Sequence, residues 1–219
     1  EAIILVDNCY GEFVETTEPT SQGADVIAGS LIKNPGGGLA PTGGYIAGRE
    51  DLIDRIAQRM TVPGMGAEVG SYAGDYRLFY QGLFLAPHVT AQCVKGAVLF
   101  ARVFEQMNLL TMPLYDANRS DIIQAVQFPD ADSLVAFCRS IQKAAPVDSF
   151  VSPEPWDMPG YEDQVVMAAG AFVQGATTEL SADGPIRAPY TAYLQGALTY
   201  AHARIAAMLA CDELIRQGL

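Results

Sequence analysis

The run at residues 2–7, Ala-Ile-Ile-Leu-Val-Asp, constrains the fold of this chain more than any other feature. Its apolar residues follow one another without the polar alternation of a strand that has one face in water. Such continuous runs are typical of strands buried on both faces of a parallel sheet. Residues 24–29 and 43–48 favour two further short strands, the last bracketed by glycines. We therefore expect an α/β fold.

The remaining pattern predicts helices at 50–60, 83–107, 132–144 and 192–216. Additional strands are expected at 122–127, 164–172 and 177–180, and the proline-rich stretch 153–160 is expected to be loop. The helix at 83–107 would connect two units, because the pattern of elements changes after it. We place one unit at residues 1–108 and the other at 109–219.

The charge balance argues against some classes of partner. The 219 residues carry 25 acids and 13 bases, a net charge of −12. Binding to nucleic acid or to an anionic membrane needs clustered Lys and Arg, so neither is expected as a partner. Charged residues interrupt every apolar stretch before it reaches about 18 residues, so no membrane span is expected. Four scattered cysteines without a Cys-x-x-Cys pair indicate free thiols in a reducing cytoplasm and no metal site.

Lys33 has the most unusual setting of the three lysines in the chain. The other two, Lys95 and Lys143, lie on expected helices, where a solvated lysine is ordinary. Lys33 follows the second expected strand and precedes Asn-Pro-Gly-Gly-Gly. A compact, partly desolvated setting of this kind frees an amine for imine chemistry. A lysine on an edge loop of the sheet is the alternative interpretation.

Asp7 and Ser30 strengthen the functional interpretation of Lys33. Asp7 ends the first strand, and a doubly wound sheet places ligands at the carboxyl ends of its strands. Pyridoxal phosphate requires such a pair, a lysine for its aldehyde and a carboxylate that keeps its pyridine nitrogen protonated. Ser30 is a candidate ligand of the cofactor phosphate. Asp7 would otherwise serve the turn that follows it.

The spacing of Ser30 and Lys33 also matches Ser-x-x-Lys, the nucleophile motif of penicillin-binding proteins and class A β-lactamases. Those enzymes carry Ser-Asp-Asn and Lys-Thr-Gly elements as well, and neither occurs in the chain. The cofactor interpretation is therefore preferred.

Three stretches resemble the Cys/Met-metabolism family of pyridoxal phosphate enzymes, which includes the cystathionine lyases and methionine γ-lyases. They are Val6-Asp7-Asn8-Cys9-Tyr10, Gly23-Ala24-Asp25-Val26-Ile27-Ala28-Gly29-Ser30-Leu31-Ile32-Lys33, and Gly43-Gly44-Tyr45-Ile46-Ala47-Gly48. Residues 34–48, 81–88, 154–164 and 179–190 are similar to one branch, the methionine γ-lyase-like or aluminium-resistance proteins. The resemblance covers nearly the whole chain.

The resemblance implies a fold and a set of roles. Residues 1–108 would be the C-terminal part of the large, PLP-binding domain of a PLP-dependent transferase (aminotransferase-type, fold type I), and 109–219 a smaller α+β C-terminal domain. Lys33 would carry pyridoxal 5'-phosphate as a Schiff base, with Asp7 at the pyridine nitrogen and Ser30 at the phosphate. The family's glycine-rich turn and stacking aromatic precede the strand with the aspartate, so the chain resembles roughly the C-terminal half. A homodimer or homotetramer is implied, because the family builds its site from neighbouring subunits.

Three further residues are candidates with open alternatives. Arg187 offers a planar fork of donors that suits the α-carboxylate of a substrate, and related enzymes take this arginine from the small domain. A surface arginine after a turn is the alternative. Tyr10 is a candidate for lining the substrate pocket, and a packed aromatic is the alternative. Asn8 is a candidate for orienting Asp7 or the cofactor ring, and a role in the turn is the alternative.

These expectations converge on a carbon–sulfur lyase that acts on a small sulfur-containing amino acid by β- or γ-elimination. Transamination and γ-replacement remain open, because Asp7 and Lys33 serve those reactions as well. From a different class, the chain would be a non-catalytic unit for structure or oligomerisation.

Overall fold

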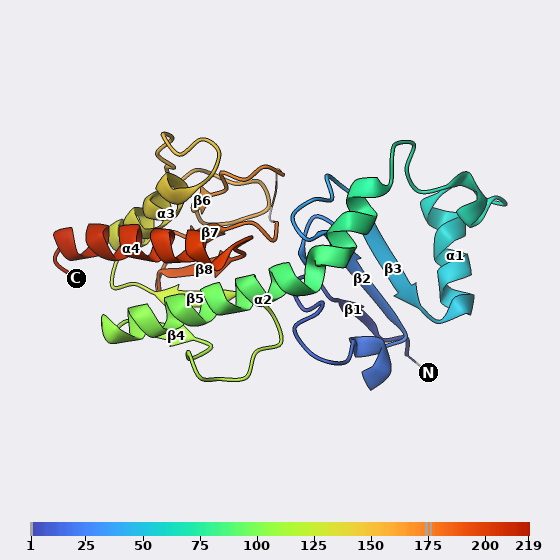
Figure 1. Cartoon of the computed structure of the whole chain (residues 1–219), viewed down its shortest axis with the longest axis horizontal. Helices are drawn as coiled ribbons and strands as arrows, with labels where there is room; N and C mark the ends of the chain where they lie inside the picture. The colour runs from blue at the N-terminus through green and yellow to red at the C-terminus, as the bar shows by residue number, and fades with distance from the viewer. Residues whose placement is uncertain (1, 174, 176) are drawn as a thin grey trace.

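The computed structural model describes residues 2–173, 175 and 177–219. Two lobes, each built on its own sheet, lie along one long helix, α2 (Figure 1). In chain order the strands and α-helices are β1 (Leu5–Asp7), β2 (Val26–Ser30), β3 (Gly44–Gly48), α1 (Glu50–Met60), α2 (Arg77–Gln106), β4 (Leu110–Met112), β5 (Gln124–Gln127), α3 (Ala131–Ala144), β6 (Val165–Ala168), β7 (Ser181–Pro185), β8 (Thr191–Gln195) and α4 (Tyr200–Arg216). Three short 3-10 helices are η1 (Pro19–Gln22), η2 (Asn34–Gly36) and η3 (Gly66–Val69).

The first sheet has the order β1-β2-β3. β1 and β2 are parallel, with Asp7 opposite Ala28, and β3 runs antiparallel to β2. The three strands expected in this region are present, although the first is shorter than residues 2–7. The helix expected at 50–60 is confirmed with its bounds as α1.

β1 is not buried as its apolar sequence predicts. Ile3, Ile4 and Leu5 are 55%, 55% and 61% exposed. The reason is position, since β1 is an edge strand that pairs only with β2 among the described residues. An apolar, unpaired strand edge is the kind of surface that folded proteins normally cover. The expectation of burial on both faces is therefore wrong for this chain.

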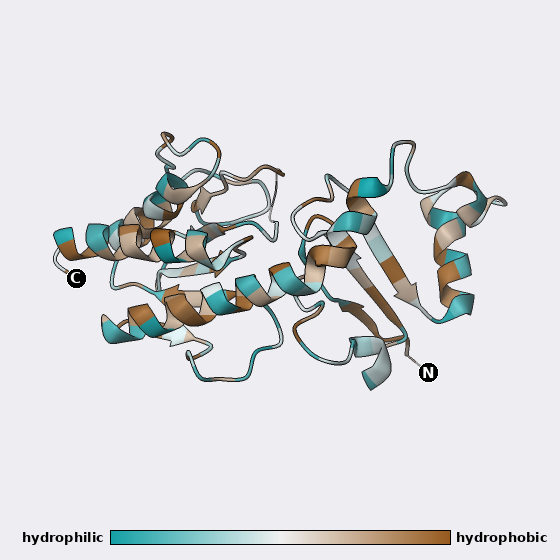
Figure 2. Cartoon of the chain, in the orientation of Figure 1, coloured by the Kyte–Doolittle hydropathy of each residue, from teal (hydrophilic) through white to brown (hydrophobic). Residues whose placement is uncertain are grey.

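The helix α2 connects the two lobes (Figure 1). It begins at Arg77, earlier than the expected residue 83, and continues through Pro87 to Gln106. Its second half packs against β4, β5 and α4, and Figure 2 shows hydrophobic residues gathered there. By length and composition alone α2 is able to cross a membrane, which the sequence analysis did not expect. Phe100 and Phe104 on this helix are fully buried within the second lobe.

Glycines hold the turn after Lys33 directly against α2. A Cβ on Gly82 of α2 would lie 2.1 Å from the carbonyl oxygen of Gly36, and one on Gly37 would lie 2.3 Å from the carbonyl oxygen of Gly82. Gly37 also has φ of 53°, in the left-handed region that favours glycine. The backbone of η2 thus contacts the backbone of α2, and this contact sets where Lys33 stands.

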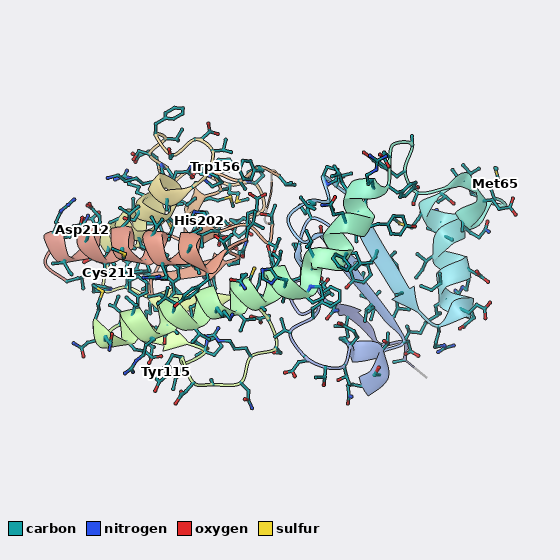
Figure 3. The ribbon with its side chains drawn as sticks, in the orientation of Figure 1. Met65, Tyr115, Trp156, His202, Cys211 and Asp212 are labelled. Carbon is teal, nitrogen blue, oxygen red and sulfur yellow. The ribbon has the colours of Figure 1, made fainter. Side chains whose placement is uncertain are left out.

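The second sheet is antiparallel throughout, in the order β4-β5-β8-β7-β6. Its covered face packs on α3, α4 and the second half of α2 around a core of aromatic side chains, in which the ring centroids of Phe104 and Phe137 lie 5.5 Å apart. His202 of α4, labelled in Figure 3, lies with Nε2 2.7 Å from the carbonyl oxygen of Ala144 at the end of α3. This contact ties the two helices together.

Some expected elements of the second lobe are wrong. The strand expected at 177–180 lies instead at Ser181–Pro185, and the short strand β4 was not expected. The helix expected from residue 192 begins at Tyr200, because Thr191–Gln195 forms β8. Ala192 and Leu194 point into the core while Tyr193 lies on the other face, which is the alternation of a strand. Thr199 then starts α4 by accepting a hydrogen bond from the backbone N–H of His202. The division at residues 108 and 109 stays a prediction.

Candidate functional site

Asp7, Ser30 and Lys33 meet at one edge of the first sheet. Asp7 is the last residue of β1 and Ser30 the last of β2, and these strands are parallel. Their carboxyl ends therefore point to the same edge, as the sequence analysis expected. Lys33 follows one turn later, and its backbone N–H donates to the Ser30 carbonyl oxygen at 3.3 Å.

Lys33 is half-buried, and its Nζ lies 4.6 Å from the centroid of the Tyr10 ring. This is a cation–π distance, and the ring holds the amine in a defined place. In the described ranges Lys33 forms no ion pair, that is, no contact of 4 Å or less between its Nζ and a carboxylate oxygen. An amine that is positioned by an aromatic face, and not tied to a carboxylate, is available for covalent chemistry.

Asp7 is an exposed carboxylate that the next turn keeps ionised. Its Oδ1 accepts a hydrogen bond from the backbone N–H of Cys9 at 3.1 Å. Hydrogen bonds from the Cys9 thiol and backbone lower the pKa of Asp7, and the positive charge of Lys33 acts in the same direction. Burial and the hydrogen bond to Asp7 raise the pKa of the Cys9 thiol. The site therefore offers one negative and one positive group, with a neutral thiol beside them.

Asn34 is a residue that the sequence analysis missed. It is fully buried, and its Nδ2 donates to the carbonyl oxygens of Tyr10 and Glu12, both at 2.9 Å. It therefore ties the loop after β1 to the turn that carries Lys33. The available signal was its place between Lys33 and Pro35, because an asparagine before proline is a typical turn residue.

The side chain of Asn8 forms hydrogen bonds with Glu18 and Tyr45. Its Nδ2 donates to Glu18 Oε2 at 2.7 Å and to the Tyr45 hydroxyl at 3.3 Å. The Tyr45 hydroxyl donates in turn to Glu12 Oε1 at 2.8 Å. Both amide hydrogens of Asn8 are thus engaged within the protein, and a turn-supporting role accounts for them. A contact with the cofactor ring stays a prediction for this residue.

Glu12 is a buried acid close to the site. It is only 3% exposed, and its Oε2 has no hydrogen-bond partner among the residues that the structure describes. Burial raises the pKa of Glu12, while a hydrogen bond from Tyr45 and the charge of Lys33 oppose that rise. A buried carboxyl with one oxygen left without a partner costs stability, and such groups are common in functional regions.

Tyr10 is packed and is shared between the two lobes. It is 7% exposed and lies in a cluster with Val89, Cys93 and Ile122. Burial raises the pKa of its hydroxyl, and the charges of Cys9 and Asp183 act in the same direction. The packed-aromatic interpretation is thus correct for most of the ring, while its face carries Lys33.

Arg187 is not brought to Lys33. The carbonyl oxygen of Ile32 accepts from the backbone N–H of Thr178 at 3.4 Å, so the start of the β7 segment lies near the site. Arg187 follows the other end of β7, about 20 Å further along an extended chain at about 3.3 Å per residue. There it is 65% exposed, and its Nε lies 3.3 Å from Asp163 Oδ2. A role for Arg187 at the carboxylate of a substrate held by Lys33 stays a prediction without support from this placement.

No group of three or more His, Cys, Asp or Glu side chains within the described ranges is arranged to hold a metal ion. The four cysteines are all free thiols.

The chain is similar to known proteins along nearly its whole length. The family model described as methionine gamma-lyase matches residues 1–215. A carbon-sulfur lyase involved in aluminum resistance from Clostridium novyi NT is 58% identical, with a TM-score of 0.92 over 97% of this chain and 50% of its own. A protein involved in aluminum resistance from Clostridium acetobutylicum is 57% identical, with a TM-score of 0.93 over 97% of this chain and 49% of its own.

The curated relative YnbB from Bacillus subtilis (strain 168) is 55% identical over 99% of this chain and 52% of its own length. The chain thus spans about half the length of these relatives. MetB from Corynebacterium glutamicum shares the fold, with a TM-score of 0.61 at 15% identity. The expected α/β fold of fold-type I PLP enzymes is confirmed by these matches.

Proposed function

The chain belongs to the methionine γ-lyase family of PLP-dependent enzymes, and from that premise we propose that it carries the lysine half of a carbon–sulfur lyase site. The substrate would be a small sulfur-containing amino acid. The observation that supports this proposal is the placement of Lys33 at the carboxyl ends of two parallel strands, beside an ionised Asp7.

The residues present fit pyridoxal 5'-phosphate in three respects. Lys33 has an amine that no carboxylate ties down in the described part of the chain. The lowered pKa of Asp7 keeps it ionised, as a partner of a protonated pyridine nitrogen must be. Ser30 is half-buried next to Lys33 and has a hydroxyl suited to a phosphate oxygen. The bound cofactor would supply an electron sink for a carbanion at the substrate α-carbon.

The protein's own contribution follows from these positions. Lys33 would hold the cofactor aldehyde and, once the substrate amine has replaced it, would move the α-proton as a general base. The Tyr10 ring would keep the freed amine close by, because the cation–π contact does not depend on the covalent bond. Asp7 would hold a proton on the pyridine nitrogen through its negative charge. The turn fixed by Asn34 keeps these groups in register.

We also propose a homo-oligomer in the cytoplasm. Four free cysteines support a reducing compartment. Exposed apolar side chains on β1 and the first half of α2, among them Leu5, Tyr80 and Phe84, support a surface that another chain covers. Light scattering that finds a compact monomer of the protein would contradict the oligomer.

The experiment that tests the reaction uses the protein saturated with pyridoxal phosphate and supplied with cystathionine or methionine. We expect release of a thiol and a 2-oxo acid, and we expect Lys33→Ala to abolish it while Lys143→Ala, on α3, leaves it unchanged. Asp7→Asn should lower kcat at least about 100-fold, because a neutral amide does not keep the ring nitrogen protonated. Absence of both products from the wild-type protein, or equal activity in Lys33→Ala, would refute the proposal.

The products also separate the reactions that share these residues. A thiol with pyruvate indicates β-elimination, and a thiol with 2-oxobutyrate indicates γ-elimination. A 2-oxo acid that keeps its sulfur indicates transamination and would contradict a lyase.

A further inference from the structure

The buried carboxyl of Glu12 lies against β2, beside the residue that precedes Ser30. A Cβ on Gly29 would lie 2.6 Å from Glu12 Oε1 and 2.5 Å from a ring carbon of Tyr45. Glycine at this position therefore leaves the space that the carboxyl and the tyrosine fill. Successive residues of a strand face opposite sides, so Glu12 lies on the face of β2 opposite to the side chain of Ser30.

A chain of hydrogen bonds ends on the Glu12 carboxyl. Asn8, the residue after Asp7, donates from Nδ2 to the Tyr45 hydroxyl at 3.3 Å. That hydroxyl donates in turn to Glu12 Oε1 at 2.8 Å. Both donors point toward the carboxyl, so the chain of hydrogen bonds stabilises its ionised form. The other oxygen, Oε2, has no partner in the part of the chain that the structure describes, so no cation of the protein is bonded to it there.

The positive charge of Lys33 acts on Glu12 across this packing. Asn34, the residue after Lys33, is fully buried and donates to the Glu12 carbonyl oxygen at 2.9 Å, which fixes the two segments relative to each other. The charge of Lys33 lowers the pKa of Glu12, against the rise that burial causes. An interaction between two charges is mutual, so the ionised carboxyl stabilises positive charge on the Lys33 nitrogen by the same free energy.

Other titratable groups also face Glu12, from its own loop and from β3. They are Tyr10, Glu18 and Tyr45. Burial raises the pKa of both tyrosines, so they are neutral at pH 8. Glu18 is partly exposed and Asp7 is exposed, so water screens their charges more than that of Glu12, which is 3% exposed. Of these three carboxylates, Glu12 therefore keeps the most of its effect on a neighbouring cation.

We propose that Glu12 is a positioning residue of the lyase site, whose buried carboxylate keeps positive charge on the Lys33 nitrogen while that nitrogen holds pyridoxal phosphate as an imine. A protonated imine reacts faster with the amine of a substrate than a neutral imine does, because its carbon is more electrophilic. Asp7 would act on the pyridine nitrogen, so the two carboxylates serve different atoms. This inference rests on the proposed function and adds the group that holds the imine proton.

The first test needs no cofactor. The protein is labelled with carbon-13 at its glutamate carboxyls, and the Glu12 signal is followed by NMR as the pH is varied. Lys33→Met removes the charge and keeps the length of the side chain, so it should raise the pH midpoint of the Glu12 signal by at least about 0.5 unit. Lys95→Met, at an exposed position of α2, should change that midpoint by less than about 0.1 unit. Equal midpoints in Lys33→Met and the wild type would overturn the proposal.

The second test follows the absorbance of the protein loaded with pyridoxal phosphate as the pH is raised, because protonated and neutral imines absorb at different wavelengths. Glu12→Gln keeps the shape and the acceptor for Tyr45 but removes the charge, so the imine should lose its proton at a pH lower by at least about 0.5 unit. Tyr45→Phe removes the hydrogen bond and keeps the charge, and Glu15→Gln removes an exposed charge of the same loop. Both should leave the imine midpoint within about 0.2 unit of the wild type.

The outcomes separate this inference from the proposed function. An imine midpoint that Glu12→Gln leaves unchanged, or that Tyr45→Phe lowers as much as Glu12→Gln does, would overturn the role of Glu12 while the lyase site stands. Absence of an imine on Lys33 in the wild type would overturn the lyase site, and this inference with it.

Discussion

Asp183→Asn tests whether the largely buried carboxylate of Asp183, on β7, costs folding energy. The substitution replaces the acid by a neutral group of the same shape. The folded protein raises the pKa of Asp183 from 3.8 to about 6 through burial. At 1.36 kcal/mol for each pKa unit this is about 3 kcal/mol, and solvent on the open side reduces it to about 2 kcal/mol.

The sign of the effect follows from the direction of the pKa change. A raised pKa means that the folded state binds the proton more tightly than the unfolded state, so the ionised form is the costly one. The penalty is complete above pH 7, declines as the pH falls through about 6, and vanishes below 3.8. Asp183→Asn should therefore be more stable than the wild type at pH 8 by about 2 kcal/mol and equally stable at pH 3.5.

The assay is urea unfolding followed by circular dichroism at pH 8, 6 and 3.5, with slopes compared to check that the transition is unchanged. Asp54→Asn, at an exposed position of α1, is the matched control for removing one negative charge. A variant that is less stable than the wild type at pH 8, or a difference that does not depend on pH, would refute the reasoning. A gain in stability at pH 8 would identify Asp183 as a carboxylate that the protein keeps at a cost to folding.

Three substitutions test other parts of the structure. Phe137→Ala empties the centre of the aromatic core of the second lobe and should destabilise the protein by about 3–5 kcal/mol in the same urea assay, and a loss below about 1 kcal/mol would contradict that packing. Asn34→Leu removes the donors to Tyr10 and Glu12 and should cost at least about 2 kcal/mol, while faster hydrogen exchange should be confined to residues 8–12 and 31–37. Gly82→Ala places a Cβ 2.1 Å from the Gly36 carbonyl oxygen and should lower the melting temperature. Gly96→Ala, on the same helix, places its Cβ no closer than 3.2 Å to a side-chain carbon of Ala203 and is the control for adding a methyl group at a helical glycine; equal melting temperatures would contradict the contact.

Local sequence features predicted the first lobe well. The turn with Lys33 directly follows the strand with Ser30. One parallel crossover separates that strand from the strand with Asp7. Their meeting at one sheet edge follows from the rule on carboxyl ends, and the register of β1 and β2 confirms it. The role of the glycines after Lys33 needed the structure, because their partner Gly82 lies on a helix more than forty residues later.

The second lobe was harder to predict for two physical reasons. Its antiparallel sheet joins residues 110 to 195, so the pairing that makes Thr191–Gln195 a strand comes from β5 and β7 and leaves little local trace. The helix-forming residues that follow made one long helix the simpler interpretation. The burial of Asp183 depends on the same pairing, so its unusual environment has no signature in the neighbouring residues.

Arg187 shows the limit of assigning a role from the residue type and from resemblance to a family alone. A small-domain arginine suggested a clamp at the cofactor lysine, but β7 carries it to the opposite end of the strand. There its Nε lies 3.3 Å from Asp163 Oδ2, and its role at a substrate carboxylate stays a prediction.

The most direct test of the central claim is to locate the residue that pyridoxal phosphate modifies. The protein is incubated with pyridoxal phosphate, reduced with borohydride, digested, and its peptides are sequenced by mass spectrometry. The account predicts one stoichiometric pyridoxyl group on Lys33, with Lys95 and Lys143 unmodified and no label in Lys33→Ala. Label spread evenly over the three lysines, or absent from Lys33, would contradict it.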